Sequence, residues 1–441
     1  MKKTLGLVSL GCAKNRVDAE VMLGILKNKN YSIVSNPEAA DVIIVNTCGF
    51  IDSAKEESIN AILEQSKHKK TGRCQTLVVS GCLSERYNKE LLKEIPEIDA
   101  VLGTGDYLEI ASVLDKVESG SQLCSYGNIN AEFSGVMPRL ITTVKPSAYL
   151  KIAEGCDNRC TYCVIPSLRG DFRSKPIEDV LEEAEVLARD GIKELIIVAQ
   201  DITRYGQDSN GQYDLTVLLK KMCRIPEIKW IRLLYAYPDR ISKGLIDTIA
   251  DEPKICKYLD IPIQHINQDI LRSMNRSSDN ESIKKLIKYI RKRIPDVVLR
   301  TSLIVGFPGE TEEQFDELIQ FVEQGNFNNM GIFTYSQEDG TKAASMEMQI
   351  SDWVKKERQG KLLSIQKRIS KRLNRKRVGQ TCEVLVEGIE SDGVYYGRSY
   401  GETPEADGLV YVSSEKPLQI GVFYKVRIVK AFEYDLMGEA E

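Results

Sequence analysis

The run Glu154-Gly155-Cys156-Asp157-Asn158-Arg159-Cys160-Thr161-Tyr162-Cys163 carries three cysteines with the spacing C-x-x-x-C-x-x-C. Three thiolates are one fewer than a closed zinc or iron–sulfur site requires, so a metal centre held here would keep one position open. A structural zinc knuckle, a disulfide with a spare thiol or chance could also produce this spacing. Zinc would need a fourth Cys or His nearby, and the only two histidines, His68 and His265, are far away in the sequence. The spacing therefore favours an iron–sulfur centre with one open iron.

The same run, with an aromatic residue just before its last cysteine, resembles the signature of radical S-adenosylmethionine (SAM) enzymes. The resemblance implies a 4Fe-4S cluster on Cys156, Cys160 and Cys163, with an unligated iron that binds the amine and carboxylate of SAM. It also implies cleavage of SAM to a 5′-deoxyadenosyl radical. Removing hydrogen from an unactivated carbon is beyond any acid or base of a protein, so a cofactor must carry that step. We therefore expect radical chemistry.

Length and composition are those of an ordinary globular protein. The 441 residues are 42% hydrophobic and 28% charged, which is enough for two or three domains. The apolar stretch in residues 1–10 is too short for a signal peptide, and no later run approaches the length that spans a bilayer. We expect a cytoplasmic protein whose eleven cysteines are reduced and serve metal binding more than disulfides.

The N-terminal part alternates strands with helices. Apolar runs are at 5–10, 41–45, 76–80 and 100–102, and helical patterns are at 18–27, 53–64, 89–94 and 107–116. Such alternation predicts a parallel α/β sheet. Cys12, Cys48 and Cys82 each come just after a strand, and the carboxyl ends of parallel strands form one crevice. The three thiols should therefore converge, although free cysteines are often only buried apolar residues. The other five cysteines have no partner at useful spacing and are read as structural.

Between residues 144 and 345 the chain again alternates strand and helix. Six strands are expected at 148–153, 194–199, 230–234, 258–263, 298–305 and 331–334. Six β/α units suit the partial barrel that the resemblance to radical SAM enzymes implies. Active sites of barrels collect at the carboxyl ends of the strands, where polar residues stand in this sequence. The candidates for binding SAM are Gln200, Asp201, Gln264, His265 and Gly306, and each also suits a helix cap or a hydrogen-bonded core group.

The last part of the chain differs in both charge and pattern. Residues 352–377 contain eleven Lys or Arg against two acids, a net of +9, whereas residues 379–441 contain five against twelve, a net of −7. The basic segment is predicted to be a helix, either a solvated connection or a contact for an anionic partner. Beyond it, short β-rich segments at 381–387, 393–398, 408–412 and 424–432 predict a small antiparallel barrel. This barrel resembles the TRAM domain, a module known from RNA-modifying enzymes.

Taken together, these parts resemble the methylthiotransferase family of radical SAM enzymes over essentially the whole chain. The expected domains are an N-terminal methylthiotransferase domain (1–120), a radical SAM partial barrel (142–350), a basic connecting helix (351–377) and a TRAM-like domain (378–441). The resemblance implies two 4Fe-4S clusters and SAM. The second cluster, on Cys12, Cys48 and Cys82, is implicated in sulfur delivery.

The family divides by substrate. The stretches 9–15, 46–51, 103–107 and 148–155 look closest to the branch that modifies the β-carbon of an aspartate in small-subunit ribosomal protein S twelve. Ala13 departs from the proline that many members of that branch carry. The acidic tail agrees with a basic protein substrate, because it should repel transfer RNA phosphates. We therefore do not expect nucleic acid as the direct substrate, and by analogy we expect a flavodoxin-like electron donor and a monomer.

Two other functions stay open from the sequence. One is a methylthiotransferase for adenosines in transfer RNA, of the MiaB-like or MtaB-like branches, because the basic helix is suited to nucleic acid. The other is a non-catalytic iron–sulfur or zinc protein that binds its partner through the TRAM-like tail.

Overall fold

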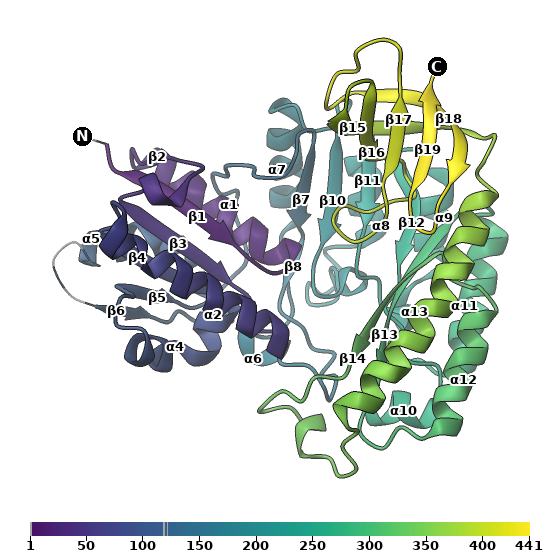
Figure 1. Cartoon of the computed structure of the whole chain (residues 1–441), viewed down its shortest axis with the longest axis horizontal. Helices are drawn as coiled ribbons and strands as arrows, with labels where there is room; N and C mark the ends of the chain where they lie inside the picture. The colour runs from purple at the N-terminus through teal and green to yellow at the C-terminus, as the bar shows by residue number, and fades with distance from the viewer. Residues whose placement is uncertain (1, 118–119, 121) are drawn as a thin grey trace.

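The computed structural model describes residues 2–117, 120 and 122–441. Three units lie beside one another in it: a parallel α/β sheet, a six-stranded partial barrel and a closed five-stranded barrel (Figure 1). Together they match the predicted fold class. Among the described residues, no helix combines the length and the apolar character needed to cross a membrane.

The N-terminal unit is a doubly wound parallel sheet with the strand order β2-β1-β3-β4-β5-β6. Its strands are β1 (Thr4–Ser9), β2 (Ser32–Ile33), β3 (Val42–Thr47), β4 (Thr76–Gly81), β5 (Ala100–Leu102) and β6 (Leu123–Ser125). Its helices are α1 (Ala13–Asn28), α2 (Asp52–Ser66), α3 (His68–Thr71), α4 (Cys82–Glu94) and α5 (Ile110–Val117). Alternate residues of β3 serve the two faces: Val42 and Ile44 pack with α1 and α5, and Ile43 and Val45 pack with α2 and α4.

The edge of this sheet and two helix starts differ from the sequence-based expectation. β2 and β6 are two and three residues long, too short to leave a readable apolar run. α1 begins at Ala13, directly after Cys12, and α4 begins at Cys82 itself. Both helices therefore begin several residues before the expected positions 18 and 89. The backbone of α4 is kinked at Tyr87, with φ −130° and ψ 35°. The sequence pattern predicted only the part of the helix that follows this kink.

The central unit is a partial barrel of six parallel strands in the order β14-β13-β12-β11-β10-β7. Its strands are β7 (Ser147–Lys151), β10 (Glu194–Val198), β11 (Trp230–Leu233), β12 (Ile255–Asp260), β13 (Val298–Val305) and β14 (Asn329–Thr334). The helices are α6 (Ile165–Arg169), α7 (Ile177–Arg189), α8 (Leu215–Met222), α9 (Lys243–Asp251), α10 (Gln268–Ser273), α11 (Asn280–Arg293) and α12 (Glu312–Glu323). The expected first strand is divided, because β8 (Ala153–Glu154) leaves the sheet to pair with β9 (Arg173–Ser174). The largest core of the molecule lies between these strands and helices.

The C-terminal unit is a closed barrel with the strand order β15-β16-β17-β19-β18. Its strands are β15 (Thr381–Ser391), β16 (Val394–Arg398), β17 (Val410–Ser413), β18 (Phe423–Ala431) and β19 (Leu436–Ala440). All pairs are antiparallel except β17 and β19, which run parallel and close the barrel. This seam corrects the expectation of a purely antiparallel barrel, and it rests on β19, which the sequence pattern did not reveal.

Buried ion pairs fasten both outer units to the partial barrel. Arg398 of β16 places Nη2 2.6 Å from Oε2 of Glu194, and Nε of Arg232 lies 2.9 Å from the other oxygen of the same carboxylate. On the N-terminal side, the carboxylate of Glu338 lies 2.7 Å from Nη1 of Arg86 and 2.9 Å from Nζ of Lys55. Arg86 and Lys55 are in α4 and α2, so the loop after β14 reaches across to the N-terminal unit.

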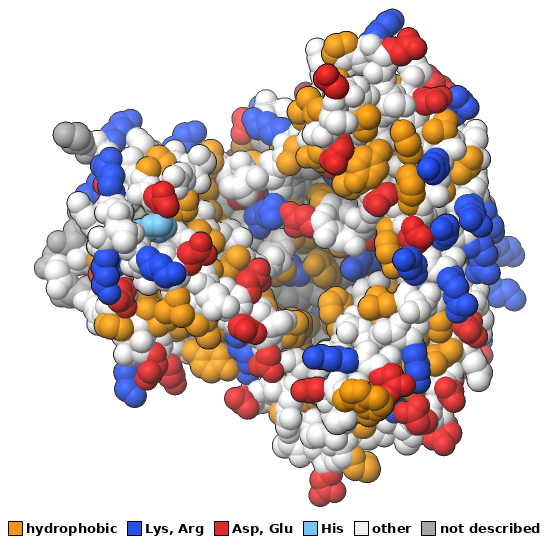
Figure 2. Space-filling model, in the orientation of Figure 1, with side chains coloured by type: hydrophobic (Ala, Val, Ile, Leu, Met, Phe, Trp, Pro, Cys, Tyr) orange, Lys and Arg blue, Asp and Glu red, His pale blue; other side chains and the backbone are white. Residues whose placement is uncertain are grey.

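The basic segment forms α13 (Asp352–Arg375), which packs on β14 and α12 and leads into the closed barrel. Its buried face includes Leu362, Ile365 and Ile369, while most of its lysines and arginines face solvent. Figure 2 shows Lys and Arg side chains gathered on the right edge of the molecule, over α13 and α11.

Candidate active site between the two parallel sheets

Cys156, Cys160 and Cys163, here called the barrel triad, lie in one loop between β8 and α6. The loop is held by its own backbone and by its neighbours. The amide of Cys156 donates to the carbonyl of Gly170 at 3.0 Å, and that of Cys163 to the carbonyl of Cys160 at 3.1 Å. Asn275 donates from Nδ2 to the carbonyl of Arg159 at 2.9 Å. Contacts within the protein therefore fix the shape of the loop.

A cation and a tyrosine lie beside Cys160 of the barrel triad. Nη1 of Arg276 lies 3.9 Å from Sγ of Cys160, and the hydroxyl of Tyr237 lies 4.0 Å from the same sulfur. Burial raises the pKa of the Cys156 thiol to about 11, and it raises the pKa of Cys163 further, because each thiolate would lack water and face other sulfurs. The guanidinium of Arg276 opposes this rise at Cys163. A bound metal would remove the penalty by taking the thiolate charge.

Cys12, Cys48 and Cys82, here called the N-terminal triad, follow the adjacent strands β1, β3 and β4. The structure confirms that each of these cysteines comes at the end of a strand, and that the three strands are neighbours in one sheet. Gly11 shows how close the loops are: its φ is +86°, and a side chain there would meet Cβ of Cys48 at 2.9 Å. The three thiols influence one another electrostatically, since Cys12 and Cys82 both raise the pKa of Cys48 beyond the rise that its burial causes.

The N-terminal triad has its own cations, Lys14 and Arg169. Cys12 is the most exposed residue of the three, but neighbouring protein atoms still reduce the hydration of its thiol and oppose its ionisation. The charges of Lys14 and Arg169 outweigh that effect and lower the pKa of Cys12. Burial raises the pKa of Cys48 to about 12. Nη2 of Arg169 lies 3.5 Å from Sγ of Cys82.

The two triads are neighbours in space. Cys82 packs in one buried apolar cluster with Val164 and Leu168, and Val164 directly follows Cys163. Thr104, in the loop after β5, donates its hydroxyl to the carbonyl of Leu168 at 2.5 Å. α6 therefore follows the barrel triad in the sequence and packs against Cys82 of the N-terminal triad. The space-filling view is hollowed between the two units (Figure 2).

The donor sets suit iron–sulfur clusters better than single ions. Each triad offers three thiols beside at least one cation, as a cluster with net negative charge requires. Among the described residues, no three His, Cys, Asp or Glu side chains are already placed to hold one metal ion. A 4Fe-4S cluster does not need such convergence, because each cysteine binds a different iron.

The predicted SAM-binding residues lie at the carboxyl ends of the barrel strands, and several have unpaired polar atoms. Gln200 follows β10 and donates from Nε2 to Glu154 at 2.7 Å, while its Oε1 is buried and finds no hydrogen-bond partner in the described part of the chain. His265 is fully buried, and its Nδ1 accepts from the amide of Asn267 at 2.9 Å. Within the described residues its Nε2 has no hydrogen bond, and Oε2 of Glu310 lies 3.9 Å from it. Burial lowers the pKa of His265 to about 3, so the ring is neutral. Such unpaired buried atoms fit groups that await a ligand.

Gln264 and Gly306 have left-handed backbones, with φ of +68° and +71°. A non-glycine residue in that region is strained, and strain of this kind gathers at functional sites. The amide of Gly306 donates to the carboxylate of Glu310 at 2.8 Å, and a side chain at Gly306 would collide with Lys355 of α13. Gly306 therefore has a packing reason to be glycine. Its role in binding SAM stays a prediction, as does that of Gln264.

Asp201 uses its carboxylate within the protein. One oxygen accepts from the amide of Thr203 at 3.0 Å and caps a short 3-10 helix. The other accepts from Nδ2 of Asn158 at 3.0 Å and from Arg240 at 3.3 Å. Because Asn158 belongs to the barrel-triad loop, these contacts position that loop. A direct contact of Asp201 with SAM stays a prediction.

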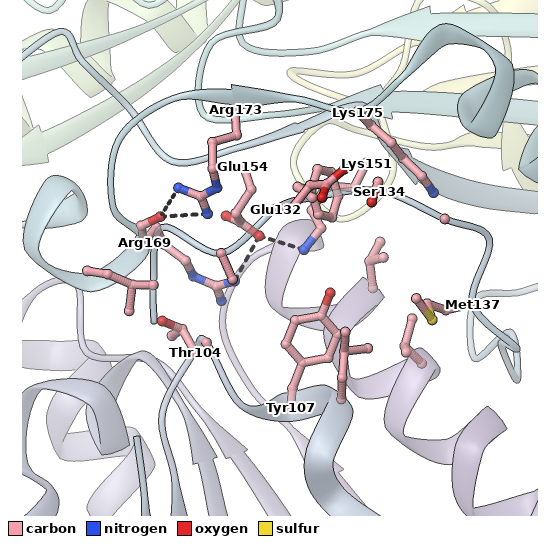
Figure 3. A pocket seen from close by; sticks show the side chains of 18 of the residues that line it. Thr104, Tyr107, Glu132, Ser134, Met137, Lys151, Glu154, Arg169, Arg173 and Lys175 are labelled. Atoms are coloured by element: carbon pink, nitrogen blue, oxygen red, sulfur yellow. Dashed lines mark hydrogen bonds and ion pairs between the residues drawn. The ribbon is translucent and has the colours of Figure 1, made fainter. Parts of the chain in front are cut away.

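Sequence reasoning missed the charged residues that fill the junction beside a cavity of about 90 Å³. Figure 3 shows Lys151, Glu154 and Arg169 converging there from β7, β8 and α6. Glu154 accepts from Lys151 at 2.6 Å and from Arg169 at 3.3 Å. The only signal in the sequence was their position next to the cysteine run.

Three family models match the chain. The radical SAM superfamily matches residues 150–322, the uncharacterized protein family UPF0004 matches residues 4–103, and the TRAM domain matches residues 378–440. Among solved structures, the radical SAM methyltransferase TsrM of Kitasatospora setae has a TM-score of 0.57 at 12% identity, over 90% of this chain and 81% of that one. The cobalamin-dependent radical enzyme OxsB has a TM-score of 0.53 at 14% identity, over 84% and 56%. These two likenesses show a shared fold alone.

Curated relatives are much more similar and span the whole chain. A protein of Thermoanaerobacter sp. (strain X514) is 52% identical over 99% of this chain and all of its own length, and one of Clostridioides difficile (strain 630) is 49% identical over 99% and 98%. A protein of Pelobacter propionicus is 51% identical over 100% and 98%. All three bear the name ribosomal protein uS12 methylthiotransferase RimO. This chain belongs to the RimO family of radical SAM methylthiotransferases.

Proposed function

We propose that this chain adds a methylthio group to the β-carbon of an aspartate in ribosomal protein uS12, using SAM and two 4Fe-4S clusters. The observation that carries the proposal is the packing of Cys82 of the N-terminal triad against Val164 and Leu168, in the segment that directly follows the barrel triad, in a chain whose full-length relatives are named RimO. The alternative is modification of transfer RNA. The names of those relatives do not support it, and the negative charge of the C-terminal barrel disfavours binding of nucleic acid.

In this proposal each triad holds one cluster: Cys156, Cys160 and Cys163 the first, and Cys12, Cys48 and Cys82 the second. When bound, the first cluster and SAM would supply a carbon radical able to remove hydrogen from an unactivated carbon. The protein residues fix the positions and exclude water. Arg276 beside Cys160 and Arg169 beside Cys82 offset the negative charge that thiolates bring into the interior.

Gln200 and His265 are the residues that we propose to orient SAM. Oε1 of Gln200 is an acceptor suited to the amine of SAM, and its amide is held in one orientation by the bond to Glu154. The neutral ring of His265 accepts at Nδ1, so its Nε2 carries the proton and can donate to the carboxylate or ribose of SAM. Both atoms are buried, and leaving them unpaired costs free energy that a bound ligand would recover.

The C-terminal barrel is proposed to attract the protein substrate. Its net charge of −7 favours a basic protein and disfavours nucleic acid. Glu390, Asp392 and Glu415 are exposed there, and no ion pair is formed by them within the described residues. Reversing all three charges to lysine should weaken binding of uS12, and the effect should fade as salt rises above about 0.1 M. Reversal of three exposed acids on α12, Glu313, Asp316 and Glu323, is the matched control.

The deciding experiment offers both substrates to the same enzyme. After anaerobic reconstitution, we expect about eight irons per chain, as two four-iron clusters require. Incubation with SAM, a reductant, uS12 and transfer RNA should add the methylthio mass to an aspartate of uS12 alone. A methylthio group on an adenosine, with none on uS12, would transfer the assignment to the transfer RNA branch. Little iron and no cleavage of SAM would support a non-catalytic binding protein.

A further inference from the structure

Arg169 connects the two halves of the candidate site. It ends α6, the five-residue helix that begins two residues after Cys163. At 1.5 Å per residue, the four steps from Ile165 to Arg169 advance about 6 Å along the helix. The guanidinium crosses into the N-terminal unit, where Nη2 lies 3.5 Å from Sγ of Cys82 and 3.1 Å from Oδ1 of Asn15.

The contacts of Arg169 continue to the predicted SAM site. Its Nη1 lies 2.5 Å from Asp18 of α1 and 3.3 Å from Glu154. Glu154 in turn accepts from Gln200 at 2.7 Å. A continuous line of buried polar contacts therefore runs from Cys82 through Arg169 and Glu154 to the end of β10. Lys151 also contacts both Asp18 and Glu154, so two cations balance two carboxylates.

This balance gives Arg169 a specific role. All four side chains are at least nine-tenths buried, and removal of one leaves an uncompensated charge in the interior. Two carboxylates take up part of the guanidinium's charge, and the remaining N–H groups are aimed at the thiol of Cys82 and at Asn15. Arg169 thus meets the N-terminal triad as a directed donor and not as a distant charge.

We propose that Arg169 is a positioning residue that seats the N-terminal triad against the barrel and raises the reduction potential of the cluster bound there. The proposal rests on the function proposed above. Reduction adds one negative charge to a cluster, and N–H···S hydrogen bonds and nearby cations stabilise that charge. In a buried site the effect is large, because water screens little. The same guanidinium fixes the distance between the two triads through α6.

The test measures the N-terminal cluster alone. The parent is the full-length chain with Cys156, Cys160 and Cys163 changed to alanine, so that one cluster remains. Arg169→Gln removes the charge, and Arg169→Lys keeps the charge but loses the two-pronged contact. In a redox titration followed by electron paramagnetic resonance, Arg169→Gln should lower the ratio of reduced to oxidised cluster at least tenfold at a fixed potential. For a one-electron couple that is a shift of about 59 mV to more negative values. Arg169→Lys should recover part of it.

Arg139→Gln is the matched control. Arg139 is buried at the same junction and pairs with Glu20 of the N-terminal unit and Glu183 of α7, at 2.6 and 2.5 Å, and among the described residues it forms no hydrogen bond with a cysteine. Its substitution removes one buried cation without changing the contact with Cys82. It should shift the potential by less than half as much as Arg169→Gln. An equal shift would mean that any buried charge at the junction acts alike, which would overturn the proposal.

Asp18→Asn keeps the proposal testable if Arg169→Gln binds no iron. It removes a carboxylate from beside the guanidinium, so the potential should move in the opposite direction, to more positive values. Shifts of the same sign in both variants, or no shift in either, would overturn the role of Arg169. If the parent itself holds no cluster, the second cluster of the proposed function fails instead, which is a separate result.

Discussion

The two cysteine triads offer the same three thiols but are built in different ways. The barrel triad lies within eight consecutive residues, 156–163, and its loop is held by one local backbone hydrogen bond and by contacts with other parts of the partial barrel. The N-terminal triad is assembled from the ends of three strands, with its members 36 and then 34 residues apart. Its geometry therefore depends on the whole sheet. We therefore expect the barrel triad to tolerate changes in the N-terminal sheet, whereas the N-terminal triad should not.

The largest expected effect follows from removing one ligand of the barrel triad. Cys160→Ala takes away a thiolate that a three-cysteine cluster cannot replace. Cleavage of SAM to 5′-deoxyadenosine should fall to background, while the iron of the N-terminal triad remains. Chromatography of the nucleoside and iron analysis measure the two results. Cys223→Ala, which removes the cysteine at the end of α8, is the control and should cleave normally. Normal cleavage by Cys160→Ala would remove the distinction between the triads.

The next effect comes from removing the other triad. With Cys12, Cys48 and Cys82 changed to alanine, iron should fall by about half, because one of two equal clusters is lost. SAM cleavage should persist, since the barrel loop is held by its own contacts, but no methylthiolated uS12 should form. Mass spectrometry of uS12 reads the result. Full product from the triple variant would show that these cysteines are structural.

A smaller change should separate the two triads without touching a cysteine. Asn15 is 1% exposed and donates from Nδ2 to the carbonyls of Leu10 and Thr47, at 2.7 and 3.1 Å, next to the loops of Cys12 and Cys48. Asn15→Ala removes one hydrogen-bond partner from each of these carbonyls and from Arg169. We expect the free energy of unfolding to fall by about 1–3 kcal/mol. Urea unfolding should show this loss. Iron should leave the N-terminal triad first.

Asn60→Ala, on the exposed face of α2, is the control for Asn15→Ala and should change neither stability nor iron content. Equal loss of iron from both triads in Asn15→Ala would contradict the idea that only the N-terminal site depends on the sheet.

The smallest effect concerns the junction that contacts neither triad. Burial alone would raise the pKa of Glu194, but Arg398 and Arg232 outweigh it and hold the pKa at about 2. An unfolded glutamate titrates near about 4.3, so these ion pairs stabilise the fold fully above that pH, and the contribution is lost as the pH falls toward about 2. We expect urea unfolding at about pH 5 to pH 3 to show this loss. The free energy of unfolding of the wild type should fall by up to about 1.4 kcal/mol per pH unit more than that of Glu194→Gln. Parallel pH profiles would contradict this origin.

Sequence reasoning succeeded where a pattern is local or repeats along a strand. The parallel sheets followed from alternating apolar runs, and the convergence of Cys12, Cys48 and Cys82 followed from their places after strands. The structure confirms the parallel sheets and places the three cysteines after adjacent strands, and their convergence on one cluster stays a prediction. The cluster ligands, the residues that contact SAM and the domain boundaries at 120, 142, 350 and 377 stay predictions.

What could not be predicted are contacts between side chains far apart in the sequence. Arg169 and Cys82 are 87 residues apart, and Glu338 and Lys55 are 283 apart. No periodic pattern in the sequence predicts such pairs, because they depend on how two folded units pack against each other. The parallel seam of β17 and β19 was missed for the same reason: strand direction at a closure is a property of the whole barrel.

The short helix α6 also makes the protein intolerant of insertions at one place. A helix turns by about 100° and advances about 1.5 Å for each residue. One residue added between Cys163 and Arg169 would therefore point the guanidinium away from Cys82 and withdraw Leu168 from its apolar cluster. The number of residues between Cys163 and Arg169 therefore sets the spacing between the N-terminal unit and the partial barrel at this point. Aligned family sequences should vary in residues 165–168 far more readily than in the number of residues that separates Cys163 from Arg169.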